Sequence, residues 1–184
     1  MIYVFLATGF EDIEALAPLD IMRRAGLDVA TVSITGEDLV ASSHGVAVRA
    51  DRLLSDVDWE AADMLVLPGG LPGSTNLDAC TKLTESILRP HAEGKALAAI
   101  CAAPMVFGHL GILKGRRATC YPGVETELEG AEYTGGIVEK DGNIITGKGP
   151  GASFEFGYAI VEHFLGEGAS EGLRKGMIYA ELFG

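Results

Sequence analysis

One cysteine stands where a buried strand is expected to turn sharply into a helix. Residues 96–100 form a short apolar run, as in a parallel strand covered on both faces, and Cys101 follows directly. Pro104 comes soon after, and proline is tolerated in a first helical turn. A thiol at a helix start lies near free N–H groups, which favour the thiolate. The sequence therefore predicts a nucleophile between strand and helix, although buried cysteines also serve as apolar filler.

A glycine-rich turn is the second feature that could take part in chemistry. Gly69 and Gly70 follow the apolar run 64–67, where a second buried strand is expected to end. One interpretation is a tight turn that needs a positive φ. The other is that the N–H groups of Gly70 and Ala102 face an oxygen bound at Cys101; both can hold together. The turn lacks the residues of a phosphate loop or a dinucleotide fingerprint.

Carboxylates near the first predicted strand are the best candidates to act on the thiol. Glu11 and Asp12 are expected to complement the dipole of the following helix. Glu14 stands among apolar residues, so its side chain points either toward the core or into solvent. The histidines have no metal-ligand or triad spacing, and the sequence predicts neither a metal nor a cofactor. They are His44, His91, His109 and His163.

The composition bounds the protein class. The chain has 184 residues, 48% apolar and 22% charged, which suits one well-packed domain over residues 1–184. A formal net charge of −12 without a basic block opposes binding to nucleic acid or to an anionic membrane. Three cysteines (Cys80, Cys101 and Cys120) and no signal-peptide pattern indicate a reducing cytoplasm. Cys80 is expected to serve in packing. Cys120 precedes Tyr121 near the carboxyl edge of the sheet, so it either packs or acts as a resolving partner of Cys101, which needs a Cα separation below about 7 Å.

Strand and helix patterns alternate along the chain, which predicts an α/β fold with a mainly parallel sheet covered on both faces. The carboxyl ends of such strands form sites, and Cys101 and the glycine turn meet there. The expected strands are 2–6, 27–34, 64–67, 96–100 and 117–120, with a β excursion at 40–50 and a hairpin at 137–146; the expected helices are 11–25, 81–92, one after Cys101, 153–165 and 169–183.

Five segments, in order along nearly the whole chain, resemble the DJ-1 branch of the ThiJ/PfpI superfamily. They are Glu11-Asp12-Ile13-Glu14, residues 20–26 (DIMRRAG), 67–70 (LPGG), 98–104 (AAICAAP) and 149–157 (GPGASFEFG). The resemblance implies a flavodoxin-like three-layer sandwich and a homodimer. It also implies that Cys101 is the reactive cysteine and that Glu14 is protonated and hydrogen-bonded to its sulfur.

Two positions refine what the resemblance implies. Some relatives have histidine in a Thr-His-Pro segment where this chain has Tyr121 before Pro122, and a phenol is a much poorer base near neutral pH. Tyr121 is therefore expected at most to orient substrate, and Glu14 to move protons. Ala102 occupies the position of a histidine in the protease-like branch, so peptidase activity is not expected.

The resemblance implies an enzyme that uses no cofactor and acts as a glyoxalase or deglycase on methylglyoxal, glyoxal or their glycated adducts. An oxidative-stress sensor or redox-regulated chaperone, in which Cys101 is oxidised, is the alternative. Either would serve a cytoplasmic stress response. The first helix carries a mix of charged and apolar residues that suits an interface, so Asp20 and a partner's His44 are expected near the site of a homodimer.

Overall fold

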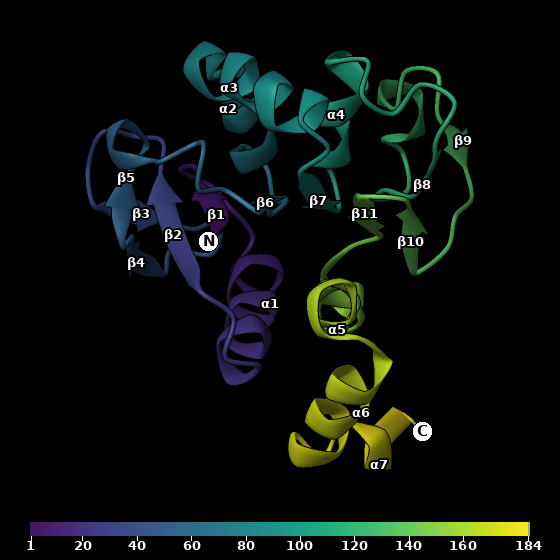
Figure 1. Cartoon of the computed structure of the whole chain (residues 1–184). Helices are drawn as coiled ribbons and strands as arrows, with labels where there is room; N and C mark the ends of the chain where they lie inside the picture. Colours follow the sequence, from purple (N-terminus) through teal and green to yellow (C-terminus); the bar gives the residue numbers. More distant parts are fainter. Residues whose placement is uncertain (184) are drawn as a thin grey trace.

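A seven-stranded sheet forms the middle layer of the protein, and helices cover both of its faces (Figure 1). The computed structural model describes residues 1–183, so Gly184, the last residue of the predicted domain, lies outside the described residues. The strand order is β10-β11-β7-β6-β1-β2-β5, and every pair is parallel except β10 with β11. The predicted three-layer α/β sandwich is confirmed.

Strands β1 (Ile2–Leu6), β6 (Met64–Leu67), β7 (Ala96–Ile100) and β11 (Ile144–Gly147) are buried along their whole length. Strand β2 (Val29–Ser33) pairs with β1, and the short β5 (Arg52–Leu53) extends this edge. At the other edge β10 (Val138–Asp141) forms the predicted hairpin with β11. Because side chains alternate along each strand, the sheet contributes side chains to two separate apolar clusters, one on each face.

One cluster lies under α1 (Asp12–Arg24) and α5 (Ser153–Leu165), which pack against each other on one face. The other lies under α2 (Gly73–Ala79), α3 (Thr81–Ala92) and α4 (Pro104–His109), drawn in teal on the opposite face (Figure 1). Thus α1 meets the sheet from one side and α4 from the other. The loops that precede them reach the same edge of the sheet.

Two small ladders stand apart from the main sheet. Strands β3 (Leu39–Ala41) and β4 (Ala47–Arg49) form the β excursion expected at 40–50. Strand β8 (Arg117–Ala118) pairs with β9 (Glu132–Tyr133), so the strand expected at 117–120 exists but is not part of the main sheet. Short 3-10 helices η1 (Leu54–Asp56), η2 (Glu125–Glu127) and η3 (Pro150–Ala152) join the remaining segments.

The C-terminal helix expected at 169–183 is wrong as a single element. The chain forms α6 (Glu167–Gly176) and α7 (Tyr179–Phe183), separated at Ile178, whose φ of 61° lies in the left-handed region. Helix α6 packs on α5 and lies beyond it from the sheet (Figure 1). Among residues 1–183, no helix is both long enough and apolar enough to cross a lipid bilayer.

Candidate active site

Cys101 occupies a sharp turn directly after β7. Its φ is 65°, a left-handed conformation that a side chain other than glycine's rarely adopts. Two backbone hydrogen bonds hold it: the Cys101 N–H donates to Gly147 O at 2.9 Å, and the Tyr121 N–H donates to Cys101 O at 2.8 Å. The side chain is buried, with 8% of the residue exposed. The fold therefore presents the thiol at the carboxyl edge of the sheet with little contact with solvent.

The helix that follows begins later than predicted. Helix α4 starts at Pro104 and has only six residues, so Cys101 is not in its first turn. The dipole argument made from the sequence was therefore wrong in its placement. Instead, the backbone N–H groups of Gly70 and Ala102 lie where they lower the pKa of Cys101. These are the two groups expected to face an oxygen bound at the sulfur.

Glu14 points into the protein beside Cys101. It belongs to the first turn of α1 and is 1% exposed. Among the described residues, no group makes a hydrogen bond of standard geometry with either carboxyl oxygen, although the Cys101 side chain and the Gly69 backbone lie close enough to favour the ionised form. Burial outweighs them and raises the pKa of Glu14 from 4.5 to about 7. Glu14 therefore exchanges a proton near neutral pH.

Gly69 explains how the carboxyl and the thiol come together. A Cβ on Gly69 would lie 2.6 Å from Cys101 Cβ and 2.8 Å from Ile100 O, and it would also collide with Glu14 Oε2. A glycine is therefore required at this point for a close approach between the two side chains. The predicted site residues Gly69, Gly70, Ala102, Glu14 and Cys101 thus lie around one point of the sheet edge.

Burial acts on the thiol in the same direction as on the carboxyl. Burial and then the charge of ionised Glu14 raise the pKa of the Cys101 thiol, against the opposing N–H groups. This direction is opposite to the one expected from the sequence, because desolvation is stronger than the nearby N–H groups. Two negative charges are not tolerated in this space, so Glu14 loses its proton near pH 7 while the Cys101 thiol keeps its own.

Glu11 is a site residue that the sequence analysis missed as such. Its carboxyl caps α1 by accepting a hydrogen bond from the Glu14 N–H at 2.8 Å, and its own N–H donates to Gly69 O at 2.9 Å. Glu11 is 8% exposed, and its negative charge helps to raise the pKa of Glu14. The signal in the sequence was an acceptor three residues before Glu14, which was interpreted only as a dipole effect.

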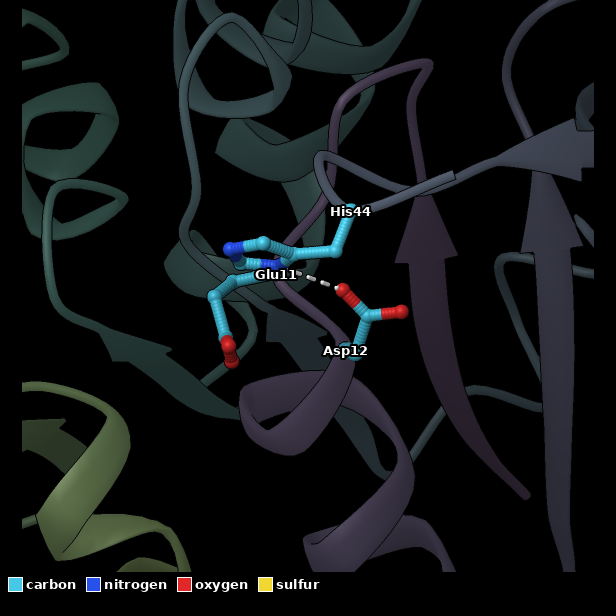
Figure 2. Close-up of side chains that lie close together, drawn as sticks. All are labelled: Glu11, Asp12 and His44. Atoms are coloured by element: carbon cyan, nitrogen blue, oxygen red, sulfur yellow. Dashed lines mark hydrogen bonds and ion pairs between the residues drawn. The ribbon is translucent and has the colours of Figure 1, made fainter. Parts of the chain in front are cut away.

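His44 and Asp12 form a pair at the surface beside this site (Figure 2). His44 Nδ1 lies 2.9 Å from Asp12 Oδ2, and the Ser42 hydroxyl donates to Asp12 Oδ1 at 2.6 Å. This contact is within one chain, and the expectation that a partner's His44 lies near the site stays a prediction. Glu11, Asp12 and His44 are the group within residues 1–183 whose donor atoms are close enough to hold a metal ion, all within 4.8 Å. Both Asp12 oxygens already have partners.

Two other predicted residues lie farther out. The Tyr121 backbone contacts Cys101, but its ring is half exposed and lies against Gly149. Asp20 pairs with Arg24 at 2.6 Å on the exposed side of α1, where its expected role at an interface stays a prediction.

Neither of the other two cysteines belongs to the apolar cluster that contains Cys101. Cys120 belongs to the apolar cluster on the opposite face from Cys101, and Cys80 lies against that same cluster. All three cysteines are free.

Comparisons with known proteins agree on one family. The model of the DJ-1/PfpI family matches residues 1–163. DJ-1 homolog B of Arabidopsis thaliana is 40% identical over 88% of this chain, but this chain spans only 37% of its length. The Parkinson disease protein 7 homolog of Danio rerio is 37% identical over 89% of this chain and 88% of its own. A deglycase of Pyrococcus abyssi is 31% identical over 82% of this chain and 90% of its own length.

Solved structures give the same result for the fold. The oxidised form of DJ-1 from Toxoplasma gondii has a TM-score of 0.93 at 33% identity, covering 97% of this chain and 98% of its own. A mutant DJ-1 superfamily protein from Salmonella typhimurium has a TM-score of 0.91 at 36% identity, covering 96% of this chain and 97% of its own. The similarity therefore extends over essentially the whole sandwich.

Proposed function

The chain belongs to the DJ-1/PfpI family, and from this premise we propose that it is a cofactor-independent glyoxalase or deglycase acting on methylglyoxal, glyoxal or their adducts. The observation that carries the proposal is the enclosed pair of Cys101 and Glu14 against Gly69. Addition of sulfur to an aldehyde requires a base for the thiol proton and donors for the developing oxyanion, roles that Glu14 and the N–H groups of Gly70 and Ala102 fill. The Pyrococcus abyssi relative, named a deglycase, supports the same reaction class.

The first step joins sulfur to the aldehyde carbon of methylglyoxal. Ionised Glu14 accepts the Cys101 proton as the S–C bond forms, and the N–H groups of Gly70 and Ala102 bind the developing oxyanion. Glu14 then returns the proton to that oxygen, which gives a hemithioacetal. Neither carbon has changed its oxidation state at this stage.

The second step moves hydrogen within the substrate. Glu14 removes the proton from the former aldehyde carbon to give an enediol, and it delivers a proton to the neighbouring carbon. The aldehyde carbon is thereby oxidised to a thioester while the ketone carbon is reduced to an alcohol. Water hydrolyses the thioester, releasing lactate and the thiol. The net reaction adds one water to methylglyoxal and needs no external oxidant.

The test measures methylglyoxal loss and lactate formation by the purified protein without glutathione or metal. We expect lactate from the wild type and from Cys80→Ser, a control cysteine outside the site, and none from Cys101→Ser. Lactate formed equally by Cys101→Ser would contradict thiol catalysis. No lactate from any of the three would end the glyoxalase proposal.

Oxidation of Cys101 is a second candidate, and one feature favours it. The Glu14 carboxyl beside the sulfur has no standard hydrogen-bond partner in the part of the chain that the structure describes, so its O–H can donate to an oxygen on oxidised sulfur. The sulfur would attack peroxide, forming an S–O bond as the O–O bond breaks, and the leaving hydroxide would take a proton to become water. Mass spectrometry after peroxide treatment should show oxygen added at Cys101 of wild type. Less stable oxidation in Glu14→Ala would support this role, and equal stability would count against it.

A homodimer completes the proposal. Exposed apolar side chains of Ile13, Ile137, Phe154 and Leu182 border one hollow between α1, β10 and the C-terminal helices. Ile13 precedes Glu14, so a second copy seated here would cover the surface next to the site. Light scattering should give the mass of a dimer. A monomer would contradict this part without affecting the reaction.

A further inference from the structure

Three segments that leave the Cys101 site meet again at their far ends. Helix α2 follows the Gly69–Gly70 turn and carries Asp78. Helix α4 follows Cys101 and ends at His109. The 3-10 helix η2 follows Tyr121 and ends at Glu127. Each segment therefore begins at a part of the site and ends at one charged cluster outside it.

His109 joins the other two segments through both of its ring nitrogens. His109 Nδ1 lies 3.1 Å from both Asp78 carboxyl oxygens, and Nε2 lies 2.9 Å from Glu127 Oε2. The cluster is only partly exposed, at 30% for His109, 29% for Asp78 and 50% for Glu127. The backbones are also close, since a Cβ on Gly108 would collide with the carbonyl of Glu127. A single side chain thus joins α2, α4 and η2.

The arrangement requires a charged imidazole. A neutral ring has one N–H and one lone pair, so it can donate to only one of the two carboxylates. The imidazolium donates to both, and these charge-assisted hydrogen bonds are stronger than neutral ones. The hydrogen bond to Glu127 and that to Asp78 raise the pKa of His109 above its ordinary 6.5, against the effect of partial burial. Glu127 and Asp78 are the charged groups acting on it.

We propose that the His109 imidazolium is a positioning residue for the Cys101 site: by bridging Asp78 and Glu127 it holds together the segments that present Gly70, Cys101 and Tyr121. When the ring loses its proton, one carboxylate faces a lone pair and the bridge opens. The site is then less well ordered, because Tyr121 N–H holds the Cys101 carbonyl and Gly70 N–H faces the sulfur. The inference rests on the proposed reactivity of Cys101 but not on its substrate.

The test follows Cys101 alkylation by iodoacetamide, so it does not depend on glyoxalase activity. Rates are measured between about pH 5 and pH 8 for wild type, His109→Gln and the control His163→Gln, a histidine on α5. His109 is followed in parallel by NMR. The ratio of wild-type to His109→Gln rates removes the titration of Glu14 and Cys101 themselves. We expect a ratio of about five at low pH, typical of a modest loss of pre-organisation, falling to about one as His109 loses its proton.

Glu127→Gln provides a second variant that keeps the histidine. With one carboxylate removed, NMR should show His109 titrating at lower pH, and the step in the alkylation ratio should move down by the same amount. His163→Gln should follow wild type throughout. A ratio that stays constant while His109 titrates would overturn the proposal, as would a step that does not move in Glu127→Gln. Loss of lactate formation with the step intact would count against the proposed substrate only.

Discussion

Two glutamates, each in the first turn of its helix, lie in opposite environments. Glu14 on α1 is buried against Cys101, it has no cationic partner within residues 1–183, and burial raises its pKa to about 7. Glu155 on α5 receives two hydrogen bonds from Arg174, at 2.6 and 2.5 Å, and one from the Tyr179 hydroxyl at 2.8 Å. The Arg174 hydrogen bonds hold the pKa of Glu155 below its usual value. One carboxyl is arranged to exchange protons, and the other to stay ionised.

The contrast separates a glutamate that holds helices together, Glu155, from a glutamate suited to proton transfer, Glu14. The Glu155 cluster fastens α6 and α7 to α5, with the Arg174 guanidinium 4.3 Å from the Tyr158 ring centroid. At the Glu14 site, burial removes water from the carboxyl and so disfavours its ionised form. We therefore expect substitutions at the first glutamate to affect activity, and substitutions at the second to affect stability.

Of the substitutions that test this contrast, Glu14→Gln should have the largest effect on activity. Without a group that exchanges protons, kcat/KM for methylglyoxal should fall about 10²- to 10⁴-fold, and the Glu14-dependent pH step should vanish. Wild-type kcat/KM should rise through about pH 7, because Glu14 must lose its proton to accept that of Cys101. Steady-state kinetics across pH check both points. A variant that keeps most of its activity would exclude Glu14 as the proton carrier.

The same variant should become relatively more stable as pH rises. Glu14 has a folded-state pKa above 4.5, so folding is unaffected by its charge at acid pH and is penalised as pH rises from 4.5 through about 7. The shift corresponds to about 3 kcal/mol. Urea unfolding of wild type and Glu14→Gln should show the stability difference moving toward the variant over that range. A pH-independent difference would contradict a buried, unpaired carboxylate.

Gly69→Ala tests whether close approach, rather than residue identity, creates the site. The added Cβ would lie 2.6 Å from Cys101 Cβ and would also collide with Glu14, so the two side chains must separate. A displacement of about 1 Å costs about 100-fold in rate. The control is Gly168→Ala on α6, where a Cβ meets nothing within 4 Å. Equal activity in both variants, measured by lactate formation, would show that Gly69 serves only the turn.

Glu155→Gln should lose stability and keep its activity. Replacing a partly exposed, bidentate pair should cost about 1–2 kcal/mol near neutral pH. Because the pKa of Glu155 is lowered, its contribution is present above 4.5 and is lost as pH falls through the folded-state value. Wild type and variant should therefore converge in acid during thermal unfolding. A fall in kcat/KM with stability intact would mean that the C-terminal helices act on the site.

The sequence predicted the parts of this molecule that are governed by local pattern. The buried strands such as Ala96–Ile100 and the helix Ser153–Leu165 have the expected bounds, because apolar runs and periodicity determine them. The break at Ile178 was missed, because the left-handed residue there is not a glycine; Ile178 itself is exposed, and its neighbours Met177 and Tyr179 contact Tyr158 of α5. Position along the sheet edge brought Cys101, Gly69 and Glu14 together as expected.

The electrostatics of the site could not be predicted in the same way. A helix start after Cys101 suggested a lowered thiol pKa, but the depth of burial, which determines the sign, depends on all the surrounding segments. The role of Glu11 was missed for the same reason. Its burial follows from the contact between its N–H and Gly69 O, which joins segments far apart in sequence.

Glu11→Gln gives the smallest expected effect and the sharpest test of how Glu14 is tuned. Glutamine keeps an oxygen that can accept the Glu14 N–H, so α1 stays capped and stability should change little. The lost negative charge no longer disfavours ionisation of Glu14, so the rise in kcat/KM should move below about pH 7. Glu11→Ala should lower stability as well, by about 1 kcal/mol for the lost cap. If Glu11→Gln leaves the pH midpoint unchanged, burial alone holds the proton on Glu14, and Glu11 serves only the helix start.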